Sequence, residues 1–311
     1  MVATSEPQAP WQHAKGALAL ERPRVMAVVN LTPDSFHDGG KLVAEGADAP
    51  NVTVALRRCQ QLVAHGADVL DLGGESTRPG AVPVSAEAEC ARVLPLLQRL
   101  AAEPTLAHVP ISIDTRHAAV AAAAVREGAA IVNDVSTLAD PAMLEVVAAS
   151  GAGLVIGHLR GEPARMQHDI RFADVLGEVT DELAAAVARA VAAGVARDRI
   201  LVDPGIGFGK TAEQSAALVA ASSWLRAATG CAVLVGASRK SFLSAITAAV
   251  GVDAGDRLVG SLSAAVVAVE RGAAVLRVHD VRETVTALAV ARAIRIAFDR
   301  AAAGRDPGDV A

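Results

Sequence analysis

An acidic residue, an aromatic ring and a lysine lie close together in residues 200–210, which read ILVDPGIGFGK. The residues just before Asp203 are apolar without polar alternation, a pattern typical of a strand covered on both faces of a parallel sheet. In sheets and barrels of βα units, ligands bind beyond the carboxyl ends of the strands. Asp203 is therefore a candidate for binding a polar substrate. Phe208 stands between two glycines and could either cover a substrate ring or fold back onto the core.

Hydrogen-bonding side chains also end the other apolar runs of the chain. At any single position, capping the next helix is the more common role of Asp or Asn. Apolar strands can end in any turn residue, however, whereas a site at the mouth of a barrel requires polar groups to converge there. The whole set therefore indicates a binding site. It consists of Asn30, Asp71, Asp114, Asn133, His158, Asp203, Ser238 to Ser241, Arg277 and His279.

The acidic and amide members of this set indicate a flat heterocyclic ligand. Two carboxylates, Asp114 and Asp203, with the amide of Asn133 offer donors and acceptors to the edge of such a ring. Phe36 lies in the long polar loop after the first apolar run, and Phe208 lies in the glycine-rich loop. Both could cover the faces of rings, because long loops with aromatic and charged groups are common places for substrate contacts.

The cationic residues indicate an anionic part of the ligand. Arg78 and Arg277 can each fork onto phosphate or carboxylate oxygens, and Lys240 can hold one as a point charge. Arg277 directly follows an apolar run, so we expect its charge to be buried. Lys210 is expected only to begin the next helix. The inferred ligand is a polar bicyclic ring that carries phosphate, or such a ring together with a separate anionic partner.

Short apolar runs alternate with alanine-rich helical stretches, which is the signature of βα units. About eight strands are expected, the number that closes a barrel. The fold class is therefore α/β, a single (β/α)8 TIM barrel with its active site at the C-terminal ends of the strands. Glycines 66, 128, 194 and 272 each follow a helical pattern and suit the left-handed position after a helix. The expected strands span residues 25–30, 68–73, 109–114, 130–133, 153–158, 200–203, 232–237 and 273–279.

One domain is expected, because no composition shift or linker divides the chain. Residues 1–24 are expected to form a flexible leader, residues 25–300 the barrel, and residues 301–311 a flexible tail. The last helix, over residues 281–300, has apolar residues on more than one face. A helix of this kind can be covered by a neighbouring subunit, so we expect a homodimer through the late helices.

Composition excludes several classes of protein. Of the 311 residues, 52% are hydrophobic and 20% are charged, as in a globular chain. The net charge of -5 argues against nucleic acid or an anionic membrane as the main partner, and no segment is apolar for the roughly 18 residues of a membrane span. Three widely spaced cysteines suit reduced thiols and predict a cytoplasmic protein.

Over residues 25–298 the chain resembles the dihydropteroate synthases, the sulfonamide-target enzymes of folate synthesis. The resemblance implies condensation of 6-hydroxymethyl-7,8-dihydropterin diphosphate with 4-aminobenzoate, which gives 7,8-dihydropteroate and diphosphate. Seven motifs in the same order are very hard to obtain by chance. They are VNLTPDSF at residues 29–36, GESTRPG at 74–80, IDT at 113–115, NDVS at 133–136, DPGIGFGK at 203–210, SRKS at 238–241 and RVHD at 277–280.

The resemblance also implies roles for individual residues. The pterin edge would be bound by Asp114, Asn133, Asp203 and Lys240, of which Asp114, Asp203 and Lys240 are the expected catalytic residues. The diphosphate would be bound by Arg277 and His279, with Mg2+ held by Asn30. The loops would contribute Asp34, Phe36, Thr77 and Arg78 to substrate binding. The aminobenzoate site would be formed by Pro79, Gly207, Phe208, Lys240 and Ser241.

Two departures from the family pattern leave this set intact. Residues 156–160 read IGHLR where the family often has methionines beside the histidine, so packing around the pterin is expected to differ. Ser261 stands where the family usually has threonine and keeps the hydroxyl. No insertion lies beside the expected aminobenzoate loops, so sensitivity to sulfonamides is expected.

Other functions remain open on the sequence. A pterin-binding methyltransferase barrel would share the acids and the asparagine but would have less need of Arg277, His279 and residues 238–241. A Schiff-base aldolase could use Lys240, since burial can make a strand-end lysine nucleophilic. A non-catalytic relative that only binds a partner would be expected to have lost members of the polar set, and none is missing.

Overall fold

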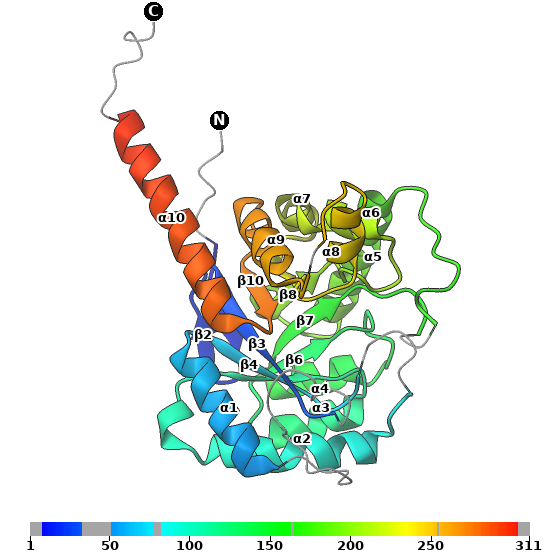
Figure 1. Cartoon of the computed structure of the whole chain (residues 1–311). Coiled ribbons are helices and arrows are strands. Elements are labelled where there is room, and N and C mark those ends of the chain that lie inside the picture. The colour runs from blue at the N-terminus through cyan, green and yellow to red at the C-terminus, as the bar shows by residue number, and fades with distance from the viewer. Residues whose placement is uncertain (1–7, 33–50, 77–81, 163–164, 254, 304–311) are drawn as a thin grey trace, which may run out of the picture.

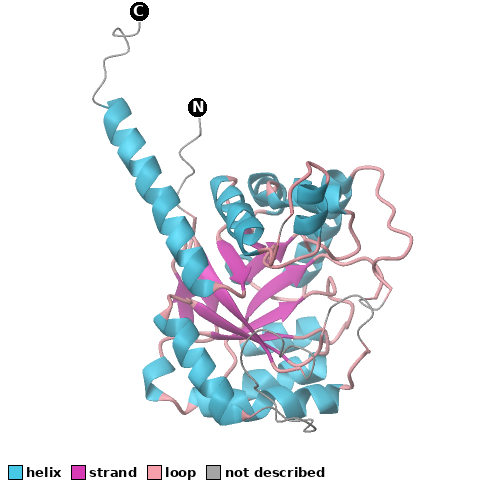
Figure 2. Cartoon of the chain, in the orientation of Figure 1, coloured by secondary structure: helices cyan, strands magenta, loops and turns pink. Residues whose placement is uncertain are grey.

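Eight parallel strands close into a barrel whose helices lie outside it, as Figures 1 and 2 show. The computed structural model describes residues 8–32, 51–76, 82–162, 165–253 and 255–303. The strands neighbour one another in the order β10-β3-β4-β5-β6-β7-β8-β9, so the first and last strands of the barrel pair and close it. They are β3 (Arg24–Asn30), β4 (Val69–Gly73), β5 (Ile111–Asp114), β6 (Ile131–Asp134), β7 (Gly153–Gly157), β8 (Ile200–Asp203), β9 (Ala232–Val235) and β10 (Val275–Val278).

Each of the eight expected strands is confirmed, and the bounds differ by a few residues at most. The strands could be predicted from short apolar runs because strands of a closed parallel barrel are covered by helices on the outside and by side chains on the inside. They therefore lack polar alternation. β4, β5, β6, β7 and β8 are buried along their whole length.

Ten α-helices are described, and those between strands pack an apolar face on the barrel. The four expected glycines follow α1, α3, α5 and α9 with φ between 96° and 103°, where a residue with a Cβ would be strained. The helices are α1 (Val52–Ala64), α2 (Ala86–Ala101), α3 (Ala118–Arg126), α4 (Met143–Ser150), α5 (Val175–Ala192), α6 (Ala212–Val219), α7 (Ser222–Thr229), α8 (Phe242–Ala248), α9 (Leu258–Glu270) and α10 (Val281–Ala303).

α10 is longer than a barrel helix needs to be and projects beyond the barrel (Figure 1). Its first part packs on the core through Val285 and Leu288, but Val290, Ile294 and Phe298 are 54%, 66% and 70% exposed. The expectation of apolar residues on more than one face is therefore confirmed. The helix runs to Ala303, so the expected boundary of the barrel at residue 300 was three residues short.

The expectation of a flexible leader is wrong for residues 8–24. Strands β1 (Trp11–His13) and β2 (Gly16–Leu18) form an antiparallel hairpin. Trp11 is 1% exposed and belongs to the cluster that fills the barrel interior with Met26, Leu201 and Val275. Its indole nitrogen donates to the carbonyl of Arg199 at 2.8 Å. The hairpin thus covers the amino-terminal end of the strands, opposite the end where the expected site residues lie.

Trp11→Ala should destabilise the protein by about 3–5 kcal/mol, because a fully buried tryptophan leaves a large cavity when truncated. Urea denaturation followed by circular dichroism measures the change in the free energy of unfolding. Trp224→Ala is the control, since Trp224 is 59% exposed and its truncation should cost much less. Equal effects of the two changes would show that the hairpin does not seal the barrel.

Candidate active site

Arg277 joins three strands at the mouth of the barrel. It projects from β10, and its Nε lies 2.7 Å from Asp71 Oδ2 on β4 while its Nη2 lies 2.5 Å from Asp114 Oδ2 at the end of β5. Asn133 on β6 donates from Nδ2 to the same oxygen of Asp71 at 3.2 Å. The expected convergence of strand-end side chains is therefore confirmed for these positions. Asp71 was noted only as a strand end, but the structure makes it the shared partner of Arg277 and Asn133.

The two expected catalytic carboxylates are poorly hydrated. Burial raises the pKa of Asp114 to about 7, and Asp71 adds to the increase, although the charge of Arg277 opposes it. Burial likewise raises the pKa of Asp203, opposed by Lys240 and by the hydrogen bond that Gly205 N–H donates to Asp203 Oδ1 at 2.8 Å. A positive charge nearby would therefore strongly stabilise the ionised form of both buried carboxylates.

The loop after β8 turns sharply to bring Phe208 beside Lys240. Gly205 has φ +66°, and a Cβ there would lie 1.9 Å from the carbonyl oxygen of His158, so only glycine fits. Lys240 Nζ lies 4.2 Å from the centre of the Phe208 ring and donates to the carbonyl of Ile206. The Phe208 ring is half-buried against Lys240 at the mouth, and its contact with a substrate ring stays a prediction.

Burial lowers the pKa of Lys240 to about 8, although the carboxylate of Asp203 favours the charged form. The turn that carries Lys240 is held by its neighbour Arg239, which has φ +59° and forms an ion pair with Asp280, with Nη2 to Oδ1 at 2.6 Å. Arg239 N–H donates to the hydroxyl of Ser261 at 2.8 Å. The hydroxyl of Ser261 therefore helps to hold the turn that carries Lys240.

His279, Ser241 and Asn30 lie at the rim of this cluster. The half-buried His279 has its Nδ1 3.1 Å from the hydroxyl of Ser238, and Ser241 is exposed at the start of α8. Around Gly73, Asn30 Oδ1 and Asp114 Oδ2 lie 3.6 and 3.7 Å from the position that a Cβ would occupy. The two side chains therefore flank the same glycine. An amide oxygen beside a carboxylate is the type of ligand that Mg2+ prefers.

Lys210 does more than begin the next helix. Its side chain is 3% exposed, and its Nζ lies 2.9 Å from both His158 Nδ1 and the carbonyl oxygen of Phe208. The other ring nitrogen of His158 lies 3.0 Å from Glu182 Oε2. Lys210 thus holds the loop that carries Phe208 through the backbone carbonyl of that residue. Glu182 gave no signal in the sequence, because it sits on α5 and meets β7 only in the folded barrel.

Five expected site residues lie outside the residues that the structure describes: Asp34, Phe36, Thr77, Arg78 and Pro79. Within the described part, an open cavity of about 600 Å3 lies at the opposite end of the barrel, beside Trp11 and Leu20. It is far from the strand-end carboxylates, and barrel enzymes carry their sites at the carboxyl ends of the strands, so it is not the candidate active site.

Comparison with known proteins agrees with this geometry. Residues 26–279 match the family described as pterin binding enzyme. The dihydropteroate synthase of Neisseria meningitidis serogroup C is 42% identical over 288 residues, which cover 92% of this chain and 98% of that protein. The dihydropteroate synthase of Escherichia coli K12 is 38% identical, with coverage of 89% and 93%.

Solved structures are similar over most of both chains. Yersinia pestis dihydropteroate synthase, in a sulfonamide drug complex, superposes with a TM-score of 0.83 at 37% identity and covers 93% of this chain and 100% of its own. The Burkholderia cenocepacia enzyme, complexed with 7,8-dihydropteroate, gives 0.81 at 40% identity with coverage of 95% and 100%. With its closed barrel, its polar strand ends and these relatives, the chain belongs to the pterin-binding enzymes and, among them, to the dihydropteroate synthases.

Proposed function

We propose that the residues at the barrel mouth divide the work of dihydropteroate synthesis among them. In this reaction the amino nitrogen of 4-aminobenzoate forms a bond to the exocyclic methylene of the dihydropterin, and the bond from that carbon to the diphosphate oxygen breaks. The amine then loses a proton. No covalent enzyme intermediate is needed. The observation that carries the proposal is the cluster of Asp71, Asp114, Asn133 and Arg277 at the ends of four strands.

The pterin edge is bound by Asp114, Asn133, Asp203 and Lys240. The carboxylates accept hydrogen bonds from the N–H groups of the ring, and the amide and the ammonium group donate hydrogen bonds to its acceptor atoms. As diphosphate leaves, positive charge develops on the methylene and spreads into the pterin. Ionised Asp114 and Asp203 stabilise that charge, and their burial strengthens the interaction because little water screens it.

The diphosphate is bound by Arg277 and His279, and Asn30 would hold Mg2+. Arg277 pairs with two carboxylates, so its guanidinium is oriented across the mouth and keeps its charge. His279 is oriented by the hydroxyl of Ser238. Mg2+, when bound, would neutralise charge on the leaving diphosphate. Asn30 fits this ion in type, since it supplies an amide oxygen and flanks Gly73 together with Asp114.

The aminobenzoate lies against Phe208 and Lys240, near Gly207 and Ser241. The ring of Phe208 offers an apolar face, and the cation of Lys240 is 4.2 Å from its centre. Together they suit a flat ring that ends in a carboxylate. A sulfonamide has the same aniline ring and an acidic group opposite it, so it should compete at this position.

The assembly and the compartment are also proposals. The exposed side chains Val290, Ile294 and Phe298 recur every four residues along α10, so they form one apolar stripe. We propose that a second copy of the chain covers this stripe in a homodimer. Buried thiols at Cys59 and Cys231 suit a reducing cytoplasm. No described helix is both long and apolar enough to cross a membrane.

Purified protein with the pterin diphosphate, 4-aminobenzoate and Mg2+ should release diphosphate. Lys240→Ala should lower kcat/KM by roughly 10- to 100-fold, because hydrogen bonds to charged groups contribute about 1.5–3 kcal/mol. Chelation of Mg2+ should lower the rate, and a sulfonamide should raise the apparent KM for 4-aminobenzoate. Lys15→Ala, an exposed lysine on the hairpin, is the control. Absence of release with both substrates present would reject the function, and full activity of Lys240→Ala would reject the role of that residue.

The pH profile of kcat/KM should be bell-shaped. Asp114 must be ionised, so the rate should fall as the pH drops through its pKa of about 7. Lys240 must be protonated, so the rate should fall as the pH rises through its pKa of about 8. Steady-state kinetics of the wild type and of Asp114→Asn measure both limbs. If the acid limb persists unchanged in Asp114→Asn, Asp114 is not the group that produces it.

Light scattering at micromolar concentration should give the mass of a dimer. Phe298→Asp should shift the population toward monomer, because a charge would then be buried in the apolar stripe. Arg292→Ala on the same helix should leave the mass unchanged. A monomeric wild type would refute the proposed assembly.

A further inference from the structure

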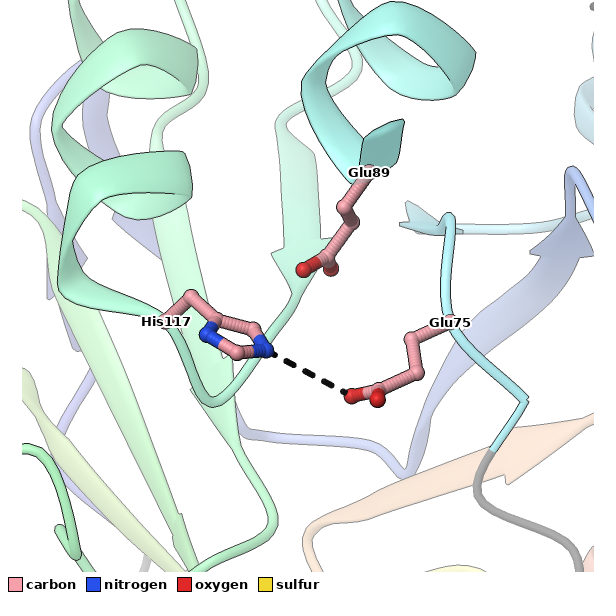
Figure 3. Close-up of side chains that lie close together, drawn as sticks. All are labelled: Glu75, Glu89 and His117. Atoms are coloured by element: carbon pink, nitrogen blue, oxygen red, sulfur yellow. Dashed lines mark ion pairs between the residues drawn. The ribbon is translucent and has the colours of Figure 1, made fainter. Parts of the chain in front are cut away.

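Three metal-ligating side chains meet beside the strand ends but outside the cluster around Arg277. They are Glu75 in the segment after β4, Glu89 on α2, and His117, which precedes α3 (Figure 3). One ligand atom from each lies within 4.8 Å of the others. None of these residues has a role in the chemistry proposed above.

Glu89 is the unexplained member of this group. Its side chain is 0% exposed, and among the described residues neither of its carboxylate oxygens makes a hydrogen bond of normal geometry. Figure 3 shows the carboxylate pointing toward the imidazole of His117 and the carboxylate of Glu75. Nε2 of His117 is also buried without a hydrogen bond in the described part of the chain, and it lies 3.9 Å from Glu75 Oε2. Buried polar atoms in native proteins nearly always have a partner, so these atoms indicate one that the described residues do not supply in full.

Among the described residues, Arg116 is the cation that pairs with this group, and it binds Glu75. Arg116 binds both oxygens of Glu75, with Nε to Oε2 at 2.8 Å and Nη2 to Oε1 at 3.0 Å. Burial opposes ionisation of Glu75, but the hydrogen bond from Arg116 and that from Val84 N–H outweigh it and lower its pKa. Arg116 therefore neutralises one carboxylate, and the second carboxylate remains. Burial raises the pKa of Glu89 to about 8, and the hydroxyl of Thr115 offsets only part of that increase.

The backbone around the group is fixed before any ligand arrives. A Cβ on Gly74 would lie 2.9 Å from Glu89 Cγ and 3.1 Å from the carbonyl oxygen of Glu89, so only glycine lets this segment pass so close to α2. Arg92 on the same helix donates to the carbonyl of Gly74 at 2.8 Å. His117 N–H donates to the hydroxyl of Thr115 at 3.1 Å. The three ligands are thus carried by three tethered segments.

We infer that Glu75, Glu89 and His117 form a binding site for a divalent first-row transition metal of the Zn2+ class, separate from the Mg2+ on the diphosphate. An imidazole with two carboxylates suits such an ion, whereas Mg2+ and Ca2+ prefer oxygen ligands alone. Tetrahedral Zn2+ with ligands at about 2.1 Å places them roughly 3.4 Å apart. The observed spacing of up to 4.8 Å requires small rotations, which two long glutamate side chains can make. Glu75 can bind through Oε2 while Oε1 keeps Arg116 and Val84, and water can complete the shell.

Titration of the chelator-treated full-length protein with Zn2+ alone tests this site by calorimetry. Neither substrate is present, so the result does not depend on the proposed catalytic roles. The wild type should bind one Zn2+ per chain in this site, and added Mg2+ should not displace it. Glu89→Gln and His117→Ala should each weaken that binding by more than about 100-fold, beyond the loss seen when an outer partner of a metal site is removed. Zn2+ should also raise the Tm of the wild type and not that of Glu89→Gln.

Two controls separate this site from other possible ligands. His65→Ala changes an exposed histidine at the end of α1, and Asn30→Ala changes the expected Mg2+ ligand; both should retain Zn2+ affinity. Glu89→Gln keeps the size of the side chain, so it should fold even if His117→Ala does not. Equal Zn2+ affinity of wild type and Glu89→Gln would overturn the inference and indicate that Glu89 is a buried carboxylic acid. Binding that is lost in His65→Ala would overturn it as well.

Discussion

The mouth of this barrel depends on one buried ion-pair junction, in which the guanidinium of Arg277 lies between Asp71 and Asp114. The cost of removing three charges from water is offset only because each finds opposite charge at hydrogen-bonding distance. Removing the guanidinium would leave two carboxylates buried with too little compensation. The same junction links β10 to β4 and β5 across the intervening strand β3, so it fixes the geometry of strands that come from opposite ends of the chain.

A second set of contacts holds the other side of the mouth. The loop after β8 crosses the end of β7 at Gly205 and is supported by Lys210, whose ammonium group is enclosed by His158 and the carbonyl of Phe208. Burial lowers the pKa of Lys210 to about 7, against the attraction of Asp203. The loop that carries Phe208 is therefore held by Lys210, and Lys240 meets the same loop through the carbonyl of Ile206. Such positioning matters for the chemistry, because two substrates must be aligned before diphosphate leaves and water must not take the place of the amine.

Much of the barrel could be predicted because parallel strands buried on both faces leave continuous apolar runs, and polar residues that end those runs must meet at one rim. Asp114, Asn133 and Arg277 were found in that way. The hairpin around Trp11 could not be, since its few apolar residues show no period and are buried only by the closed barrel beneath them. Glu89 and Glu182 were not predicted as site residues, because a single acid on a helix gives no signal in the sequence. Their partners lie on other elements, so the significance of either residue exists only in the folded chain.

The central claim is that Asp114 and Arg277 form one charged unit, in which we propose that the carboxylate binds the pterin edge and the guanidinium binds the diphosphate. A double-mutant cycle on kcat/KM tests it most directly, with Asp114→Asn, Arg277→Met and the double variant assayed under identical conditions. The junction predicts strong non-additivity, with a coupling free energy of about 1 kcal/mol or more, because either change alone already breaks the unit. Additive effects of the two changes would show that the carboxylate and the guanidinium act independently and would contradict this account.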